Sequence, residues 1–219
     1  MIRWGAIIVA LLLALPLWAG PESLAPKRSL LPHVRPVSMV ASRWDHLPQA
    51  ARWNAAALTA LRSHAQGLPD QVPRDIADWC PSYPLANRAG REAFWVGLLS
   101  ALAKHESTWR PAAVGGGGRW YGLTQILPST AEHYGCRATT GSALTDGAAN
   151  LSCALRIMAR TVRRDGVVSR GMRGVAADWG PFHSERKRED MRDWLREQPY
   201  CRAPGRSPLP RLRPVRDAR

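Results

Sequence analysis

The sequence predicts an all-α domain with an extension at each end. The chain has 219 residues and is 45% hydrophobic, which is enough to bury one good core. Apolar residues recur at helical spacing, and few segments show the alternation of a half-buried strand. Glycine and proline residues separate the periodic segments. We therefore expect a single folded domain over residues 41–201, stabilised by disulfides.

The helices follow from the apolar spacing, taken in chain order. The first helix is expected from about residue 48 to residue 66, and the second ends at Glu106. A short helix should follow Pro128, where Ser129 and Glu132 have the spacing of a capping box. The remaining helices are expected at about residues 147–164, 174–178 and 185–197.

The N-terminus has the three parts of a secretory signal: a basic start, an apolar segment and small residues. We expect cleavage after Ala19, although Leu17 at the third position back leaves an uncleaved membrane anchor as the alternative. Residues 20–40 are rich in proline and basic residues and indicate a linker. In either case the domain is exported, which predicts a periplasmic or other exported location with possible membrane association through the N-terminus.

Four cysteines on an exported chain predict disulfides. Three pairings are possible, and we favour Cys136 with Cys153 and Cys80 with Cys201. The second pair would join the two ends of the domain. No CxxC motif is present, so we expect neither a zinc site nor a thioredoxin-like redox motif, and no other metal is predicted.

The net charge of +14 predicts an anionic partner. Much of the excess lies in residues 202–219, where arginine alternates with proline, so this tail should be disordered. We expect the cell wall or an anionic membrane surface as the partner rather than nucleic acid, because no nucleic-acid-binding motif is recognised. The alternative is a tail that only increases solubility.

Glu106 is the candidate catalytic residue. It continues the apolar stripe of Trp95, Leu99 and Leu102 at helical spacing, which places it toward the core at the end of a helix. Burial and the negative end of the helix dipole both oppose ionisation of a carboxyl group. The pattern therefore predicts a raised pKa for Glu106 and a side chain that keeps its proton near neutral pH.

Three motifs resemble the soluble, goose-lysozyme-like lytic transglycosylases. Residues 105–107 read His-Glu-Ser, residues 122–126 read Gly-Leu-Thr-Gln-Ile, and residues 128–131 read Pro-Ser-Thr-Ala. Asn150 and Leu151 resemble a fourth, Asn-Ile, step of the family. The resemblance covers roughly residues 90–182 and implies a lysozyme-like fold, peptidoglycan glycan strands as the substrate, and no cofactor. We expect a monomer.

One motif departs from the family pattern. Residues 176–181 read Ala-Ala-Asp-Trp-Gly-Pro where the family usually has Ala-Tyr-Asn-Ala-Gly-Pro. Ala177 thus replaces the tyrosine that normally approaches the catalytic carboxyl group, and Asp178 replaces the asparagine. Tyr121 or Tyr134 is a candidate to supply a hydroxyl instead. Asp178 is a candidate second acid, which would raise one of the two pKa values if it stood near Glu106.

The resemblance implies that Glu106 acts as general acid and then as general base, cleaving the β-1,4 bond between MurNAc and GlcNAc and forming a 1,6-anhydromuramoyl end. The alternatives are a hydrolytic muramidase that uses Glu106 and Asp178, or a peptidoglycan-binding protein without activity. We expect Ser107 to orient Glu106, Gln125 to hydrogen-bond, and tryptophan faces to stack on sugars. The predicted substrate-binding residues are Ser107, Trp120, Tyr121, Gln125, Asn150, Asp178 and Trp179.

Overall fold

The computed structural model describes residues 40–202. The predicted signal sequence or anchor, nearly all of the 20–40 linker and the basic tail after residue 202 lie outside these residues. Within the described part, no helix is both long and apolar enough to cross a membrane.

The domain is mainly helical, as the sequence predicts. Short 3₁₀ segments at Ile76–Asp78, Tyr83–Leu85, Arg170–Met172, Gly174–Ala177 and Gly180–His183 connect the longer helices. The first predicted helix is shorter than expected and is followed by turns. The α-helices are α1 (Ala50–Leu61), α2 (Arg88–Ser107), α3 (Pro128–His133), α4 (Gly141–Leu144), α5 (Gly147–Asp165) and α6 (Glu185–Arg196).

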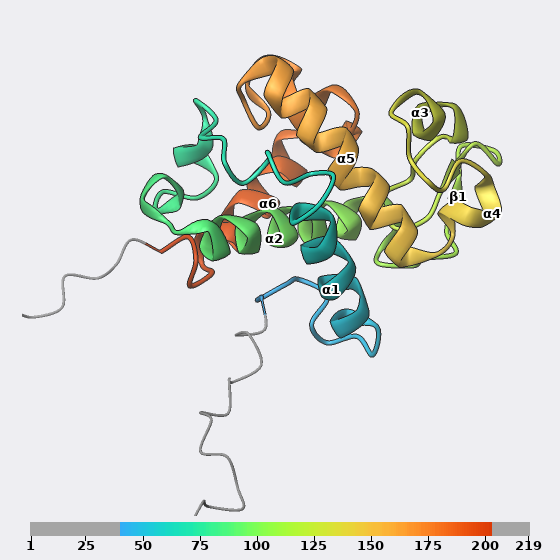
Figure 1. Cartoon of the computed structure of the whole chain (residues 1–219), viewed down its shortest axis with the longest axis horizontal. Helices are drawn as coiled ribbons and strands as arrows, with labels where there is room; N and C mark the ends of the chain where they lie inside the picture. The colour runs from blue at the N-terminus through green and yellow to red at the C-terminus, as the bar shows by residue number, and fades with distance from the viewer. Residues whose placement is uncertain (1–39, 203–219) are drawn as a thin grey trace, which may run out of the picture. The chain divides into compact units, whose positions relative to one another are not determined.

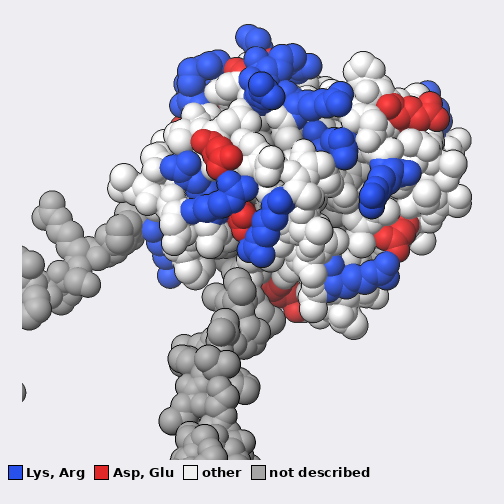
Figure 2. All heavy atoms as spheres, in the orientation of Figure 1, with Lys and Arg blue, Asp and Glu red and all other residues white. Residues whose placement is uncertain are grey.

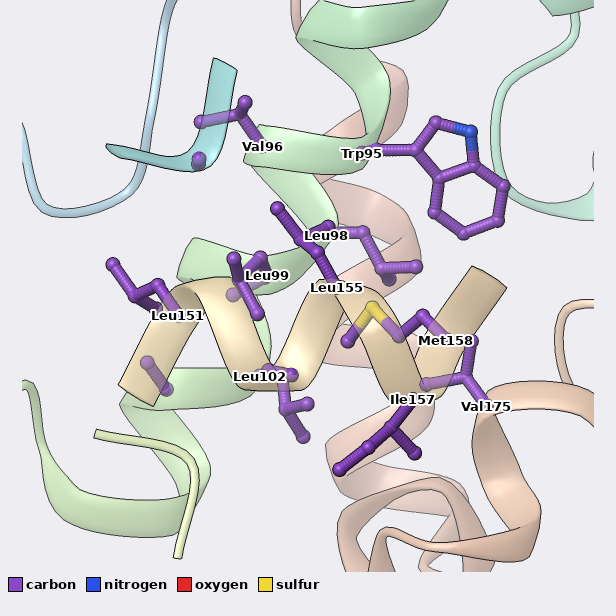
Figure 3. Packing of buried hydrophobic residues seen from close by; sticks show 14 of the residues in the cluster. Trp95, Val96, Leu98, Leu99, Leu102, Leu151, Leu155, Ile157, Met158 and Val175 are labelled. Carbon is purple, nitrogen blue, oxygen red and sulfur yellow. The ribbon is translucent and has the colours of Figure 1, made fainter. Parts of the chain in front are cut away.

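Helices α2 and α5 form the centre of the core. Figure 3 shows α5 crossing α2, with Leu99 and Leu102 from α2 close to Leu151 and Leu155 from α5. All four side chains are fully buried. Helix α1 packs along α5, and α6 packs along α2. The C-terminal end of α2, which carries Glu106, is thereby fixed between the core and α6.

The long helices have clear end signals. The Asn87 side chain accepts a hydrogen bond from the backbone N–H of Gly90 and caps α2, and Asp146 caps α5 in the same way through Ala149. Helix α2 ends at Thr108 and α5 at Gly166, both in the left-handed conformation. These caps fix where each helix begins and ends.

The predicted capping box at α3 is wrong. The N-cap is Leu127, no side chain caps the helix, and Ser129 lies inside the first turn. Pro128 occupies the first helical position, where its missing N–H costs nothing, so the helix begins two residues too early for Ser129 to cap it. The predicted helix at 174–178 is a 3₁₀ segment over Gly174–Ala177.

Both predicted disulfides are confirmed. Cys80 pairs with Cys201 and Cys136 pairs with Cys153, with sequence separations of 121 and 17 residues. Two disulfides indicate an oxidising, extracytoplasmic environment. The Cys80–Cys201 bond joins the beginning and the end of the domain, as expected from the sequence.

A small hairpin lies between α2 and α3 and was not predicted. Strands β1 (Val114–Gly115) and β2 (Trp120–Tyr121) pair antiparallel, with Val114 opposite Tyr121 and Gly115 opposite Trp120. The loop Gly116–Gly118 has positive φ at all three residues, a conformation that glycine adopts without strain. Figure 1 shows β1 beside α3 and α4 at the end of the domain where α5 begins.

Candidate active site

A cavity of about 400 Å³ lies at the C-terminal end of α2. Four segments that are far apart in the sequence contribute to it: the end of α2, the hairpin with the residues after it, the segment 178–181, and the first turn of α6. Its lining residues are His105, Glu106, Gly115, Gly116, Trp120, Gln125, Asp178, Trp179, Gly180, Pro181 and Lys187. The cavity thus brings together Glu106 and four of the seven predicted substrate-binding residues.

Glu106 lies half-buried on the wall of this cavity rather than inside the core. Burial raises the pKa of its carboxyl group more than the nearby charge of Lys187 lowers it, and the resulting pKa is about 7. No group in residues 40–202 contributes a hydrogen bond that holds the carboxylate form. The upward shift expected from the sequence is therefore confirmed, and the side chain is protonated in a large fraction of molecules at neutral pH.

The hairpin places Trp120 and Gln125 in the cavity. Trp120 is 36% exposed, and the guanidinium of Arg119 lies 5.1 Å from the centre of its ring. Gly116 allows the ring to lie against the loop, because a Cβ atom there would come within 2.1 Å of it. The tryptophan therefore presents an aromatic surface at the cavity, and its ring lies in the space that a side chain at position 116 would need.

Gln125 adopts a left-handed backbone conformation with φ of 49°. Its Nε2 donates hydrogen bonds to the backbone oxygens of Gly122, at 2.9 Å, and Ala113, at 3.2 Å. These bonds fix the amide group across the hairpin, with Oε1 so close to Gly115 that a Cβ atom there would lie only 2.2 Å from it. The side chain is thus oriented before any ligand binds, and its carbonyl oxygen is the group that faces the hairpin glycines.

Asp178 and Trp179 line the opposite side of the cavity. Trp179 is buried, and its Nε1 donates to the backbone oxygen of Thr124 at 2.9 Å. Asp178 is exposed at the surface, and its Oδ2 accepts a 3.4 Å hydrogen bond from the Tyr134 hydroxyl. Partial burial raises the pKa of Asp178, and the charge of Glu106 is not among the causes. Like-charge coupling between these two acids therefore does not explain either shift.

The other three predicted substrate-binding residues, Ser107, Tyr121 and Asn150, do not line the cavity. Their side chains form hydrogen bonds with the backbone of the surrounding loops. Buried Ser107 donates to the backbone oxygen of Leu123 at 2.8 Å, which ties the end of α2 to the following loop. The Tyr121 hydroxyl donates to the Gly118 oxygen at 2.6 Å. Neither Tyr121 nor Tyr134 lines the cavity beside Glu106, and the Tyr134 hydroxyl donates to Asp178.

Asn150 joins α5 to the 121–124 loop. Its Oδ1 accepts from the backbone N–H and the hydroxyl of Thr124, at 2.9 and 2.7 Å. Its Nδ2 donates to the backbone oxygens of Tyr121 and Leu144, at 2.9 and 3.0 Å. Every hydrogen-bonding group of this fully buried amide is paired within the protein. Its place in the structure is that of a positioning residue behind Gln125.

Two ionisable residues of the cavity, His105 and Lys187, are not among the predicted site residues. His105 is held by Asp190 of α6, whose Oδ2 lies 2.7 Å from Nε2, and Arg43 and Lys104 pair with the same carboxylate. Lys187 reaches the cavity because α6 packs on α2. No pattern in the sequence marks Lys187, which is one of several charged residues at the start of α6. Within residues 40–202, no cluster of three or more His, Cys, Asp or Glu side chains is arranged to hold a metal ion.

Comparisons with known proteins agree with this geometry. Residues 84–176 match the family model of the Transglycosylase SLT domain. Three solved structures of DslA from Bdellovibrio, the wild type and two variants with glutamate replaced by glutamine, align with TM-scores of 0.68. They are 26–27% identical in sequence, and the alignment covers 75% of this chain and 99% of theirs. No curated protein sequence matches the chain.

The matched region begins just before α2 and ends in the Gly174–Ala177 segment, so it includes Glu106, the hairpin and α5. The sequence motifs and the family model cover the same part of the fold, and the solved structures align with it as well. The chain therefore carries a lysozyme-like domain of the Transglycosylase SLT family.

Proposed function

We propose that this protein is a peptidoglycan lytic transglycosylase that cleaves the β-1,4 bond between MurNAc and GlcNAc and leaves 1,6-anhydromuramoyl ends. A Transglycosylase SLT domain implies cleavage of peptidoglycan glycan strands, which gives the substrate class. The observation that carries the proposal is Glu106, an acid with a pKa of about 7 on the wall of a cavity between aromatic side chains. The disulfides support action outside the cytoplasm, in the periplasm.

The proposed reaction uses the Glu106 carboxyl group twice. The protonated acid first gives its proton to the glycosidic oxygen as the bond to C1 of muramic acid breaks. The resulting carboxylate then takes the proton of the C6 hydroxyl group as that oxygen attacks C1. The new C1–O6 bond replaces the broken one, Glu106 ends protonated as it began, and no water is consumed. A pKa near 7 suits both steps, because the group must donate and accept a proton at neutral pH.

The other cavity residues bind the strand in this proposal. The exposed face of Trp120 stacks on a sugar ring, and the preoriented amide of Gln125 accepts a hydrogen bond from a sugar hydroxyl. Trp179 forms an apolar floor that excludes water near Glu106. We assign Ser107, Tyr121 and Asn150 to holding these groups in place.

Product analysis tests this function. Purified sacculi are digested with the wild-type protein and the soluble fragments are measured by mass spectrometry. We expect anhydromuramoyl ends, which are lighter than hydrolysed ends by the mass of one water. The Glu106→Gln variant should lose at least about 100-fold in rate, the lower bound for loss of a general acid. Glu189→Gln, which changes a carboxyl group outside the cavity, is the matched control.

A hydrolytic muramidase is the second candidate, because Asp178 lines the same cavity and its pKa is also raised. In that mechanism Asp178 would activate a water molecule on the other face of the sugar. Fragments with hydrolysed ends, together with a large loss of rate in Asp178→Asn, would establish it and overturn the transglycosylase. Binding of sacculi without release of fragments would instead indicate a wall-binding protein.

A further inference from the structure

A second concave region lies between α5 and α1 with the turns that follow α1, and it shares no lining residue with the active-site cavity. It consists of two adjoining cavities of about 670 and 450 Å³, which share His64 and Arg156 in their walls. Both are larger than the cavity at Glu106. We call this region the basic groove and define it by His64, Arg137, Arg156, Arg160 and Arg163.

The basic groove carries strong positive charge without matching acids. No aspartate or glutamate is among its lining residues, and none of its four arginines forms an ion pair within residues 40–202. Many other arginines of the domain, such as Arg62 and Arg88, pair with carboxylates. Figure 2 shows more Lys and Arg than Asp and Glu on the face in view. Unpaired guanidinium groups in a concave wall form a site for carboxylate or phosphate groups.

The arrangement of the arginines suits an extended ligand. Arg156, Arg160 and Arg163 follow one another at i, i+4 and i+7 along α5, so they lie on one face of the helix. At a rise of 1.5 Å per residue this row spans about 10 Å along the helix axis. The two cavities follow this row, because Arg156 lines both of them and Arg160 and Arg163 line the second. A flat membrane surface would not reach into them, which favours a polymer segment as the occupant.

One side chain connects the basic groove to the active-site cavity. The Arg160 guanidinium carbon lies 5.9 Å from the ring centre of Tyr134. The Tyr134 hydroxyl in turn donates to Asp178, which lines the cavity with Glu106. Arg160 is therefore separated from the active-site cavity by the side chains of Tyr134 and Asp178, which places the two regions close together.

We propose that the basic groove binds the carboxylate groups of the stem peptide carried by the peptidoglycan strand whose sugars occupy the active-site cavity. This inference rests on the proposed function, because it names a further part of the same substrate. The stem peptide is an extended chain with several carboxylates, attached to the sugar that Glu106 acts on. It supplies both the shape and the negative charge for which the groove is suited.

The test compares two forms of the substrate in the full-length protein. Sacculi with intact peptides and glycan strands stripped of peptides by an amidase are digested by wild type and by Arg156→Gln/Arg160→Gln. The double variant should raise KM on peptide-bearing sacculi about fivefold, as expected for two exposed charge contacts, and leave KM on stripped strands unchanged. The control Arg170→Gln/Arg196→Gln removes the same charge near Asp78, outside the groove, and should behave as wild type.

A direct binding measurement separates this inference from the proposed function. Free stem peptide is titrated into the wild-type protein by calorimetry, and we expect salt-sensitive binding that the double variant loses. If peptide binds but no fragment is released from sacculi, the proposed function fails and the groove assignment survives. If the variant changes KM equally on both substrates, or wild type does not bind the peptide, the inference is overturned. Binding of polyphosphate but not of peptide would assign the groove to a phosphate polymer and overturn it as well.

Discussion

The ammonium group of Lys187 and the carboxyl group of Glu106 share one cavity, where the lysine charge opposes the burial that raises the Glu106 pKa to about 7. Lys187 comes from the first turn of α6, where its backbone N–H donates to the capping hydroxyl of Ser184. The helix that packs against α2 thus also sets the electrostatic environment of the proposed acid.

Substitution of Lys187 by methionine should move the pH profile. A positive charge favours the carboxylate, so its removal raises the pKa of Glu106 further. Since the first step needs the protonated acid, the fall of kcat/KM on the alkaline side should begin near pH 7 in wild type and at higher pH in Lys187→Met. Arg186→Met removes a neighbouring charge outside the cavity and is the control. Superimposable profiles for wild type and Lys187→Met would exclude an electrostatic role for this lysine.

The stability of the protein should also report on Glu106. Its pKa in the folded state, about 7, lies above its ordinary value of 4.5, so folding favours the protonated form. This contribution is complete below pH 4.5 and is lost as the pH rises toward 7. Glutamine does not ionise, so Glu106→Gln should melt higher than wild type at pH 8 and much closer to it at pH 4. An equal difference in melting temperature at both pH values would show that Glu106 ionises as freely as in the unfolded chain.

The hairpin loop offers a matched pair of substitutions. Gly116 and Gly117 both have positive φ, so alanine is strained at either position by about 1 kcal/mol or more. Only at Gly116 would the new Cβ atom meet Trp120, while at Gly117 nothing lies within 4 Å. We expect Gly116→Ala to raise KM for glycan strands severalfold through displacement of the Trp120 ring. Gly117→Ala should show a similar loss of stability with KM near that of wild type, and equal KM values would count against sugar stacking by Trp120.

Asn150 should be sensitive to loss of its amide group alone. In Asn150→Asp, an oxygen replaces the nitrogen that donates to the backbone oxygens of Tyr121 and Leu144. Both backbone oxygens then lose their hydrogen-bond donor and face another oxygen acceptor in a buried site. This loss should lower the free energy of unfolding by about 2–5 kcal/mol. Asn87→Asp is the control, because aspartate caps a helix as well as asparagine does. Chemical denaturation measures both variants, and a loss of less than 1 kcal/mol in Asn150→Asp would contradict the proposed positioning role.

The long helices could be predicted because their apolar residues repeat over several turns. Helix α5 was placed within one residue at its C-terminal end, and the end of α2 within one residue of Glu106. The hairpin could not be predicted, because a strand of two residues has no room for an alternating pattern. At α3 the proline determines the start of the helix, so the capping-box spacing of Ser129 and Glu132 does not mark it.

The catalytic acid could be predicted from its position on an apolar stripe, but its partners in the cavity could be predicted only in part. Trp120 and Gln125 lie within twenty residues of Glu106, and Gln125 belongs to the Gly-Leu-Thr-Gln-Ile motif. Lys187 approaches only through the packing of α6 on α2, supported by the contacts of Asp190 with Arg43, Lys104 and His105. Such a contact depends on tertiary structure, and local sequence does not encode it.

The bond between Cys80 and Cys201 encloses every residue that lines the active-site cavity and all four arginines of the basic groove. A protease that cuts the main chain once anywhere between these cysteines would leave two pieces that remain covalently attached. The pieces would keep a high effective concentration for one another, so the cut molecule could reassemble its site instead of losing half of it by diffusion. For a protein that works outside the cytoplasm, this disulfide would therefore keep both parts of the active site together after a single cut in the backbone.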